Sequence, residues 1–553
     1  MRRILFGRLS SAQSERRRHR FVGLNHSAWA AIVLCVVCLG AGCSFPLRTV
    51  AQPTPSAVTA ELSPTPTPTA TRVSPRSATN NIVIAIPADP PGFDPHVAVS
   101  PISFLITRNI YDTLVEVGER GTLAPRLAEE WSTNEDRTMW SFSLKDNIFF
   151  GNGQRLTARD VAYSIERLIG PATANVRAGE YGVIESIGIS DTLSINFHLR
   201  EPKVTLPLEL ANDWAAIVPD ESGDQLYTRP IGTGPFRLKE WERGRYVALE
   251  RFSDVTLSSG GLAIDDLVFR VVPTEADRIY ALQSGEVDIV AGLSISATYE
   301  LQGDRDISLF QIPAAEVKVL AFNHARPPFD DLRVRQAICY GIDRQALIEE
   351  VWYGAAAPAG TEFSASDPYR AELTDAYPHD APRAQALLAQ AGYDRGLDAG
   401  ISVPNDDQYM RLAEALARQL AEIGVRLEIV PVDWTVFLNE VYFGREFDLT
   451  LMTHKGKTDP LTALARYKSG SSWNYLNYAN SEYDQMIASV SASAPDELVE
   501  GLTSLQRFLV EDAMVAYLAS PLITTAVRNE VKGCRLLPDG LCDLRTVYKE
   551  PVR

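Results

Sequence analysis

An alternation of helical and extended patterns restricts the possible fold of this chain more than any other feature. Residues 275–282 have the apolar spacing of a helix, and residues 285–290 then have the pattern of a strand. The helical spacing returns at 381–391 and at 412–423, each time followed by a glycine that suits a helix end. Alternating helices and strands pack as sheets covered by helices. We therefore predict an α/β fold.

The stretch from residue 317 to residue 343 combines a strand, a turn and a helix. Its first residues alternate as a strand, which Pro327 and Pro328 break. Asp330 is predicted as the N-cap of the following helix. One face of that helix is formed by Val334, Ala337, Ile338 and Gly341. We expect its charged residues, Arg333, Arg335 and Asp343, to be solvated or ion-paired.

Several shorter patterns precede this stretch. Residues 81–86 and 140–144 are predicted strands, and Thr157 with Asp160 forms a capping box at the start of a helix. Residues 232–235 read Gly-Thr-Gly-Pro, which predicts a compact, rigid turn. Because no helix opens directly after this turn, it does not predict a phosphate-binding loop.

The N-terminal residues 1–43 have the pattern of an export signal. Seven arginines lie in the first 20 residues, and an apolar run of twelve follows at residues 28–39. Twelve residues are too few to span a bilayer, which favours a cleaved signal. Small residues at 40–42 precede Cys43 and resemble a bacterial lipobox, so we expect lipidation of Cys43. Ordinary secretion without a lipid is the alternative.

Residues 44–80 are rich in Pro, Thr, Ser and Ala, with alternating Pro and Thr at residues 64–69. Such a segment cannot bury a core and favours extended conformations. We predict a semi-stiff linker that would hold a globular body away from a membrane.

Charge and cysteine content limit the partners and the redox environment. The formal net charge is −17 although the export signal is basic, so the remainder is strongly acidic, which argues against nucleic acid as a partner. Cys534 and Cys542 are eight residues apart around Pro538, Asp539 and Gly540, a pattern that predicts a small disulfide-closed turn; two free thiols are the alternative. Cys339 is predicted to be buried in its helix.

The sequence offers little support for catalysis. It contains neither the His-Glu-x-x-His nor the Gly-x-Ser-x-Gly motif, and the histidines after the signal are not spaced as helical metal ligands. Residues 456–458 imitate the end of a P-loop, but Leu451 stands where the first glycine should be. We therefore expect no enzyme activity, no cofactor and no metal site. A secreted acid–base hydrolase is the remaining catalytic alternative.

Several ordered blocks resemble one family. The order of Tyr111, the turn at Gly153 and the helix carrying Arg167, together with residues 232–235 and 321–343, is similar to the family 5 solute-binding proteins. These are the peptide/nickel-type receptors of ATP-binding-cassette (ABC) importers, and the resemblance covers residues 82–530.

The resemblance implies a periplasmic-binding-protein-like fold of the extended type, with two ligand lobes, a hinge and an additional domain. Lobe I would comprise residues 81–123, 229–322 and 524–553, the additional domain residues 124–228, and lobe III residues 323–523. The hinge would lie near Asn323 and Pro521, and the ligand would bind between lobes I and III.

Candidate ligand-binding residues lie on loops near the expected cleft. They are Asp89, Phe93, His96, Trp434, His454, Lys457, Asp459, Trp473, Asn474 and Tyr475. The aromatic residues offer broad contact surfaces, although each could instead belong to the core. His454 could point to the metal-chelate branch of the family or could be polar lining alone.

The loop at residues 452–460 bears on ligand class. Asp459 and Pro460 match a pair in the family, whose peptide-binding members resemble one another in an Asp three residues earlier that pairs with the ligand's ammonium group. Here that position is Gly456, between Lys455 and Lys457. The ligand would then carry an anionic group, or would be a peptide held mainly through its backbone.

These observations predict an extracytoplasmic lipoprotein, periplasmic or anchored to the outer face of the cell membrane. It would capture peptides between two lobes and deliver them to an ABC permease in the membrane, and we expect a monomer. Alternatives are a receptor of the same fold for a nickel chelate, an oligosaccharide or another small solute, and a sensor that signals without transport.

Overall fold

The computed structural model describes residues 81–118, 121–173, 175–252, 264–456 and 458–550. The predicted signal, Cys43, the linker and Lys457 lie outside the described residues. Within the described part of the chain, no helix is long and apolar enough to cross a membrane.

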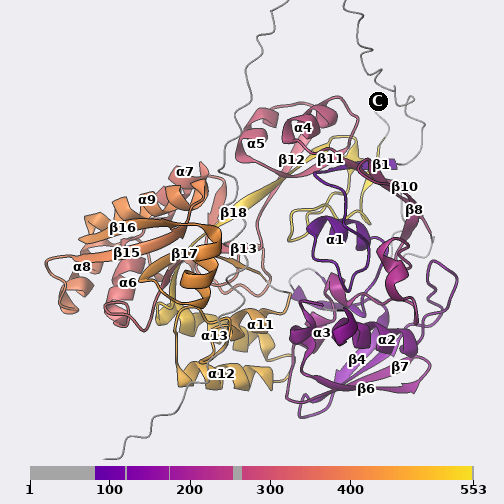
Figure 1. Ribbon diagram of the computed structural model, residues 1–553, viewed down its shortest axis with the longest axis horizontal. Coiled ribbons are helices and arrows are strands. Elements are labelled where there is room, and N and C mark those ends of the chain that lie inside the picture. The colour runs from indigo at the N-terminus through magenta and orange to yellow at the C-terminus, as the bar shows by residue number, and fades with distance from the viewer. Residues whose placement is uncertain (1–80, 119–120, 174, 253–263, 457, 551–553) are drawn as a thin grey trace, which may run out of the picture. The chain divides into compact units, whose positions relative to one another are not determined.

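A 12-stranded sheet forms the centre of the fold and has two halves (Figure 1). In the first half, β1 pairs in parallel with β10 and β11, and β8, β9 and β10 continue as an antiparallel edge. The strands of this half are β1 (Asn81–Ile86), β8 (Phe236–Glu242), β9 (Tyr246–Arg251), β10 (Asp266–Val271), β11 (Ile289–Leu293) and β12 (Ile307–Pro313). Alternate residues of β1, Ile82, Ile84 and Ile86, are buried in the core of this half. We refer to this half as lobe I.

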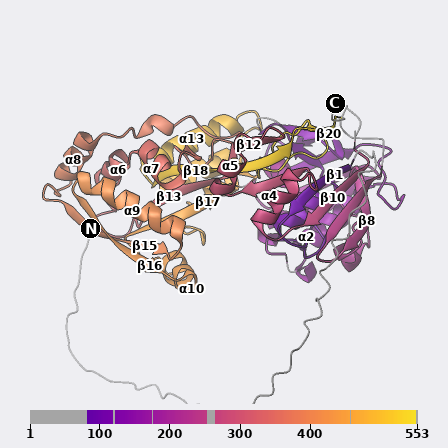
Figure 2. The same cartoon turned by 90° about the horizontal axis from the view of Figure 1, so that it is seen from above.

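The long strand β18 (Val515–Arg528) belongs to both halves, and Figure 2 shows it running between them. Its second part pairs with β11 and β12, whereas its first part pairs with β13 (Glu316–Phe322) and β14 (Ala356–Pro358). Ala314 N donates to Pro521 O over 2.8 Å where the partner changes. The strands therefore cross between the halves near residues 314–315 and 521.

The crossing agrees with the expected hinge at Pro521 but differs from the expected position at Asn323. Asn323 follows β13 and donates through Nδ2 to the backbone oxygen of Phe447, within lobe III. The whole of β13 pairs with β17 (Leu449–Lys455). The apolar run of β13 is continuous in sequence, and only the strand pairing reveals where its partners change.

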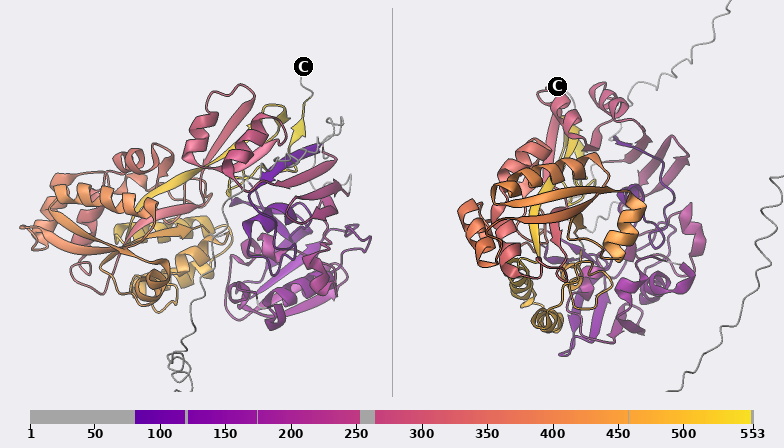
Figure 3. Two further views of the ribbon diagram at one scale, coloured as in Figure 1. Left: turned by 45° about the horizontal axis from the view of Figure 1, so that its top comes forward. Right: turned by 60° about the vertical axis from the view of Figure 1, so that its left-hand side comes forward.

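The second half of the sheet is covered by helices on both faces (Figure 3). Leu320 and Phe322 of β13 pack against one group of helices, whereas Val317, Val319 and Ala321 pack against another. The alternating residues of β13 thus point to two faces of the sheet, and both faces are buried. The first group is α6 (Leu332–Gly341), α7 (Arg344–Trp352), α8 (Ala381–Gln390) and α9 (Asp407–Glu422), and the second is α11 (Pro460–Ala465), α12 (Ser481–Ser491) and α13 (Leu498–Glu511). We refer to this half, with the added strands β15 (Leu397–Pro404) and β16 (Val425–Val432), as lobe III. It includes β13, which the predicted bounds placed in lobe I, because all of β13 pairs with β17.

The additional domain has its own four-stranded antiparallel sheet in the order β4-β5-β7-β6. The strands are β4 (Ala128–Thr133), β5 (Met139–Leu144), β6 (Ile184–Asp191) and β7 (Ser194–Leu199). Helix α2 (Ala158–Ile169) packs on it and begins with the predicted capping box, in which Asp160 accepts from Thr157 N over 2.8 Å. The short helix α3 (Leu206–Glu209) follows, and the core of the domain continues beyond it to Ala215 and Ile217.

The remaining elements are short or lie at the edges of the lobes. They are α1 (Pro101–Thr107), β2 (Val115–Val117), β3 (Leu123–Pro125), α4 (Glu275–Gln283), α5 (Ile295–Leu301), α10 (Trp434–Val436), the π-helix Phe437–Phe443, β19 (Val531–Lys532) and β20 (Tyr548–Lys549). Near the C-terminus, Cys534 and Cys542 form a disulfide, whereas Cys339 is a buried thiol.

Two predicted boundaries differ by a few residues. The N-cap of α6 is Asp331 and not Asp330, because the turn continues one residue further, with Asp331 N donating to Pro328 O over 3.2 Å. The strand predicted at 285–290 starts only at Ile289, because Glu286 N and Val287 N still donate to Ala281 O at the end of α4.

Candidate functional site

The loop after β17 lies where the two halves of the sheet meet. Leu449 and Leu451 are fully buried in β17, and Lys455 at its end is exposed. Gly456 N donates to Ala315 O over 2.7 Å, which ties the loop to the crossing between β12 and β13. A Cβ added at Gly456 would lie 3.1 Å from the same oxygen, so a side chain here would need a local shift.

A cavity of about 740 Å³ opens on one side of this loop, between the additional domain and lobe III. The additional domain contributes Glu180, Glu201 and Lys203 to its lining. Lobe III contributes charged and aromatic residues, among them Tyr442, Lys455, Asp459, Arg466, Lys468 and Trp473. We call this the lobe III cavity.

A second cavity, of about 360 Å³, is also lined by a residue of this loop. Thr458 and Ala315 line it from the side of lobe III and of the crossing. The opposite wall is formed by residues of lobe I, of the segment after α3 and of the C-terminal segment, including Arg108, Asp112, Glu116, Arg126, Asp539 and Arg545. We call this the lobe I cavity. Because both cavities reach the loop, its described residues form the centre of the candidate site.

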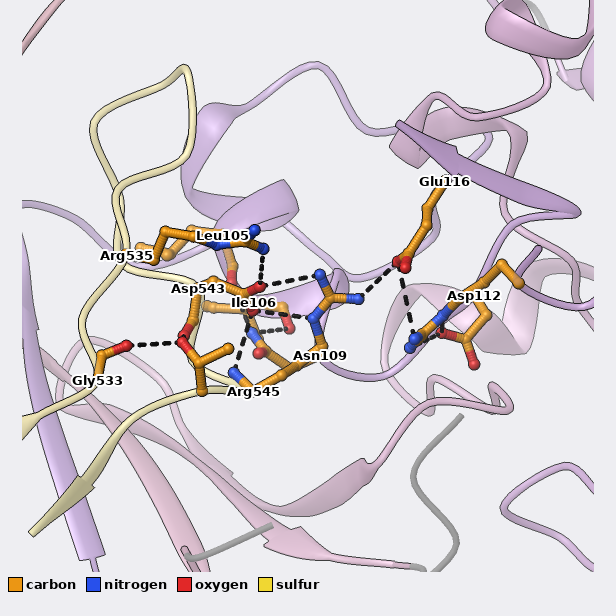
Figure 4. A network of polar contacts seen from close by, with 11 residues as sticks. Leu105, Ile106, Asn109, Asp112, Glu116, Gly533, Arg535, Asp543 and Arg545 are labelled. Carbon is orange, nitrogen blue, oxygen red and sulfur yellow. Dashed lines mark hydrogen bonds and ion pairs between the residues drawn. The ribbon is translucent and has the colours of Figure 1, made fainter. Parts of the chain in front are cut away.

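Ion pairs hold the wall of the lobe I cavity in place (Figure 4). Arg545 Nη1 lies 3.0 Å from Glu116, and Arg126 lies 2.5 Å from Asp112 and 3.7 Å from the same Glu116. Arg545 also pairs with Asp543 over 2.9 Å. Burial would raise the pKa of Asp543, but the Arg545 guanidinium outweighs burial and holds that pKa at about 2. These pairs fasten the C-terminal segment to the first strands of the chain.

A buried polar cluster lies behind the wall of the lobe III cavity. His454 Nδ1 is 2.9 Å from Glu362, and His454 Nε2 is 2.7 Å from the Tyr475 hydroxyl. Tyr467 donates to the same carboxylate over 2.5 Å. Burial would raise the pKa of Glu362, but His454 and Arg466 together keep it below its ordinary value. Both ring nitrogens of His454 are thus engaged inside the protein.

The three candidates after β1 contact other parts of lobe I and the additional domain. Asp89 accepts from Trp241 Nε1 over 3.0 Å, and Phe93 is fully buried against the ring of Trp241. His96 is buried with Nε2 2.9 Å from Ala216 O, and burial lowers the pKa of His96 to about 4. The described lining of the two cavities includes none of the three. Their observed contacts are those of packing residues.

The candidates in lobe III divide into exposed and buried residues. Trp473 is 64% exposed and lines the lobe III cavity. Trp434 is 59% exposed and stacks on Phe437, but it is not part of the described lining of either cavity. Asn474 is buried and donates to the backbone oxygen of Tyr478 over 2.7 Å.

Asp459 lines the lobe III cavity but is also the N-cap of α11. Its Oδ1 accepts from Leu461 N over 2.9 Å, and its Oδ2 accepts from the Thr462 hydroxyl over 2.6 Å. The residue is only 3% exposed. Its observed contacts are therefore those of a helix cap.

The sequence did not indicate the contribution of the additional domain. Lys203 lies 2.5 Å from Glu209 in the additional domain and 3.8 Å from Asp459 in lobe III. Burial and the neighbouring Asp459 carboxylate raise the pKa of Glu209 to about 8. Backbone contacts support the same junction, since Val204 N donates to Ser491 O over 2.9 Å. No short-range pattern links residues that are more than 250 positions apart, so this junction had no signal in the sequence.

The described residues contain no group of three His, Cys, Asp or Glu side chains that could hold a metal ion. Charged and aromatic side chains around a polar cleft instead suit the binding of a small organic solute.

Comparison with known proteins places the chain in a family. Residues 122–475 match the family described as "Bacterial extracellular solute-binding proteins, family 5 Middle". The "Dipeptide-binding protein" of Escherichia coli strain K12 is 27% identical over 501 residues, which cover 83% of this chain and 92% of that protein. The "Heme-binding protein A" of Haemophilus influenzae is 27% identical over 454 residues, covering 74% and 82%.

A solved structure shows the same fold. The periplasmic murein tripeptide binding protein MppA, in its unliganded open form, superposes with a TM-score of 0.78 at 22% identity, covering 86% of this chain and 98% of that one. This chain belongs to the family 5 extracellular solute-binding proteins of ABC importers. It is a solute-binding protein and not an enzyme.

Proposed function

We propose that this protein is the peptide receptor of an ABC importer and binds its ligand at the loop between the two cavities. This proposal is carried by the observation that Lys455, Gly456 and Asp459 line the lobe III cavity, whereas Thr458 of the same loop lines the lobe I cavity. A ligand there would touch both lobes. The dipeptide-binding relative supports peptides as the ligand class.

The proposed mechanism is capture by closure and not catalysis. Lobe III would move against lobe I and the additional domain about the crossing near residues 314–315 and 521. A ligand that contacts both walls stabilises the closed state by its differential affinity for that state. The closed form would then deliver the ligand to a permease, and a lipid on Cys43 with the linker at residues 44–80 would keep the receptor near it.

A non-peptide solute is the second candidate. Gly456 stands where the family's peptide receptors resemble one another in an ammonium-binding Asp, and a relative of similar identity is a heme-binding protein. A metal chelate held by His454 is less well supported, because Glu362 and Tyr475 occupy both nitrogens of its ring.

The ligand itself is the direct test. The protein would be purified from an exporting host, and native mass spectra would be recorded before and after denaturation. A tight ligand stabilises the folded protein by RT ln(1 + [L]/Kd), so retention through purification is expected. Release of peptides would support the proposal. Release of a heme, a metal chelate or a glycan would refute the peptide assignment and favour the second candidate.

The anchor needs a separate measurement. The mass of the mature N-terminal peptide from the same host should begin at Cys43 and carry a diacylglycerol. A start elsewhere, without a lipid, would exclude the anchor and leave the receptor proposal unchanged.

A further inference from the structure

Two lysines of lobe III face the lobe III cavity without an ion-pair partner among the described residues. Lys455 ends β17 and Lys468 follows α11; both are exposed and both line the cavity. The cross-strand neighbour of Lys455 is Glu316, but Glu316 pairs with Lys318 over 3.2 Å. The two ammonium groups are therefore available to a ligand.

Arg466 is a third cation in the lining of this cavity. Arg466 lines the same cavity, lies 3.3 Å from the buried Glu362 carboxylate, and donates through Nε to Ala463 O over 3.0 Å. Its guanidinium group is thus fixed at the edge of the cavity. A fixed guanidinium can support an anion held by more mobile lysines.

Among the described residues, the lobe III wall of this cavity has no carboxylate that is available to pair with a ligand's ammonium group. Among the described residues that lobe III contributes to the cavity, the acidic one is Asp459. Both of its oxygens are used in capping α11, and Lys203 lies 3.8 Å away. At Gly456, the position of the family's ammonium-binding Asp, an added Cβ would lie 3.1 Å from Ala315 O, which leaves little room for a carboxylate side chain.

The opposite wall has the opposite charge. The additional domain contributes Glu180 and Glu201 to the same cavity, together with Lys203, which is paired with Glu209. Cations thus gather on lobe III and carboxylates on the additional domain. A peptide with free ends has one positive and one negative end, and complementary charge fixes the orientation of such a ligand.

We propose that the peptide binds with its C-terminal carboxylate on lobe III, at Lys455 and Lys468, and with its ammonium group towards Glu201. This inference rests on the proposed peptide function and assigns the polarity of the bound ligand. Trp473 and Tyr442, which line the same wall, would contact an apolar side chain near the carboxylate. Closure would exclude water and strengthen the ion pairs, because charges interact more strongly at lower effective dielectric constant.

The test compares peptides with blocked ends. The probes are three synthetic mixtures of tri- to pentapeptides of Ala, Ser, Leu and Phe: with free ends, acetylated at the N-terminus, and amidated at the C-terminus. Binding to the full mature protein would be measured by titration and native mass spectrometry. Amidation is expected to weaken binding by about tenfold or more, the effect of losing a charge-assisted contact, and acetylation by less.

Variants connect the effect to the two lysines. Lys455→Gln with Lys468→Gln should weaken binding of the free and acetylated mixtures about tenfold and leave the amidated mixture unchanged. Lys239→Gln is the matched control, because Lys239 is exposed on lobe I and pairs with Asp266 over 3.0 Å. The melting temperature of the empty protein should be the same for all three proteins.

The outcomes separate the two proposals. If acetylation abolishes binding while amidation is tolerated, or if the lysine variants bind the free mixture normally, the proposed polarity is wrong and the peptide function stands. If none of the three mixtures binds, the peptide function itself is refuted.

Discussion

Side chains around the candidate site owe their positions to particular hydrogen bonds, and Asp459 is the clearest case. Its two oxygens serve a backbone N–H and a hydroxyl in the first turn of α11. The sequence predicted Asp459 as a ligand contact. In the structure its side chain is only 3% exposed, which suits a structural role. Substitution distinguishes the two roles.

Asp459→Ala is expected to lower the free energy of unfolding of the empty protein by about 1–2 kcal/mol, because the first turn of α11 loses its cap. The free energy of unfolding should fall less for Asp459→Asn, because the amide oxygen of Asn can still cap the helix. Urea unfolding without ligand measures both. An Ala variant as stable as the wild type would mean that Asp459 serves the ligand instead.

Glu209 gives the junction between the additional domain and lobe III a pH dependence. Its pKa of about 8 lies above the ordinary value of 4.5, so between these pH values the folded protein holds a proton that the unfolded chain releases. The free energy of unfolding should therefore fall as pH rises from about 4.5 to about 8. Above that range the contribution of Glu209 to this free energy should be constant.

Glu209→Gln removes this titration. Its free energy of unfolding should exceed that of the wild type by an amount that grows across the same pH range, up to about 5 kcal/mol at roughly 1.4 kcal/mol per pKa unit. Glu201→Gln, an exposed neighbour, is the control. Parallel pH curves for Glu209→Gln and wild type would show that Glu209 is not protonated in the folded state.

At the scale of elements, tight turns fix the strands that carry the site. The turn containing Gly232 packs against the segment before Asp112, with Gly234 N donating to Ile110 O over 2.8 Å and Thr233 donating to Asp112 over 2.9 Å. A Cβ at Gly232 would lie 2.0 Å from Ile110 O. The turn therefore supports one wall of the lobe I cavity.

Gly232→Ala should destabilise the protein by about 3 kcal/mol or more, or prevent folding, because backbone atoms cannot move aside as a side-chain end can. Gly179→Ala is the matched control, since a Cβ there meets nothing within 4 Å. Thermal unfolding and the soluble yield would be compared. Equal stability of the two variants would contradict the close approach.

At the scale of the whole molecule, β18 is the connection through which the lobes are linked. It pairs with β11 and β12 in lobe I and with β13 in lobe III, and the change of partner falls at Pro521. Few strands cross between the halves, so rotation about the crossing requires little disruption of either core. This is the geometry of a hinge.

Saturating ligand is expected to compact the protein and to stabilise it by about 2.7 kcal/mol at a concentration of 100 Kd. Small-angle scattering and thermal unfolding on the same samples measure the two effects. The Lys455→Gln and Lys468→Gln double variant should need about tenfold more peptide to reach the same compaction and the same stabilisation. Stabilisation without any change in the radius of gyration would argue against closure.

Local patterns predicted much of the fold. The capping box at Thr157, the Asp380 cap of α8 and the helix ends before Gly392 and Gly424 all follow the sequence, because caps and apolar spacing depend on neighbours a few residues away. The order of these blocks was also sufficient to identify the family, which the comparison with known proteins confirms.

The candidate site was predicted only in part. Lys455, Gly456, Asp459 and Trp473 line the lobe III cavity, but Phe93 and Tyr475 are buried. An aromatic residue on a loop looks the same in sequence whether it faces solvent or a core. What decides between them is the packing of distant segments, such as the Tyr475 hydroxyl against His454.

Residue identity and short-range spacing were enough to predict the α/β class, most helices and their caps, the family and the absence of an acidic residue at position 456. The positions where the strands cross, the cations that face a cavity and the approach of Lys203 to Asp459 became clear from the packed structure. Contacts such as Arg545 with Glu116 join residues 429 positions apart. Their formation depends on how whole lobes pack, which local sequence patterns do not encode.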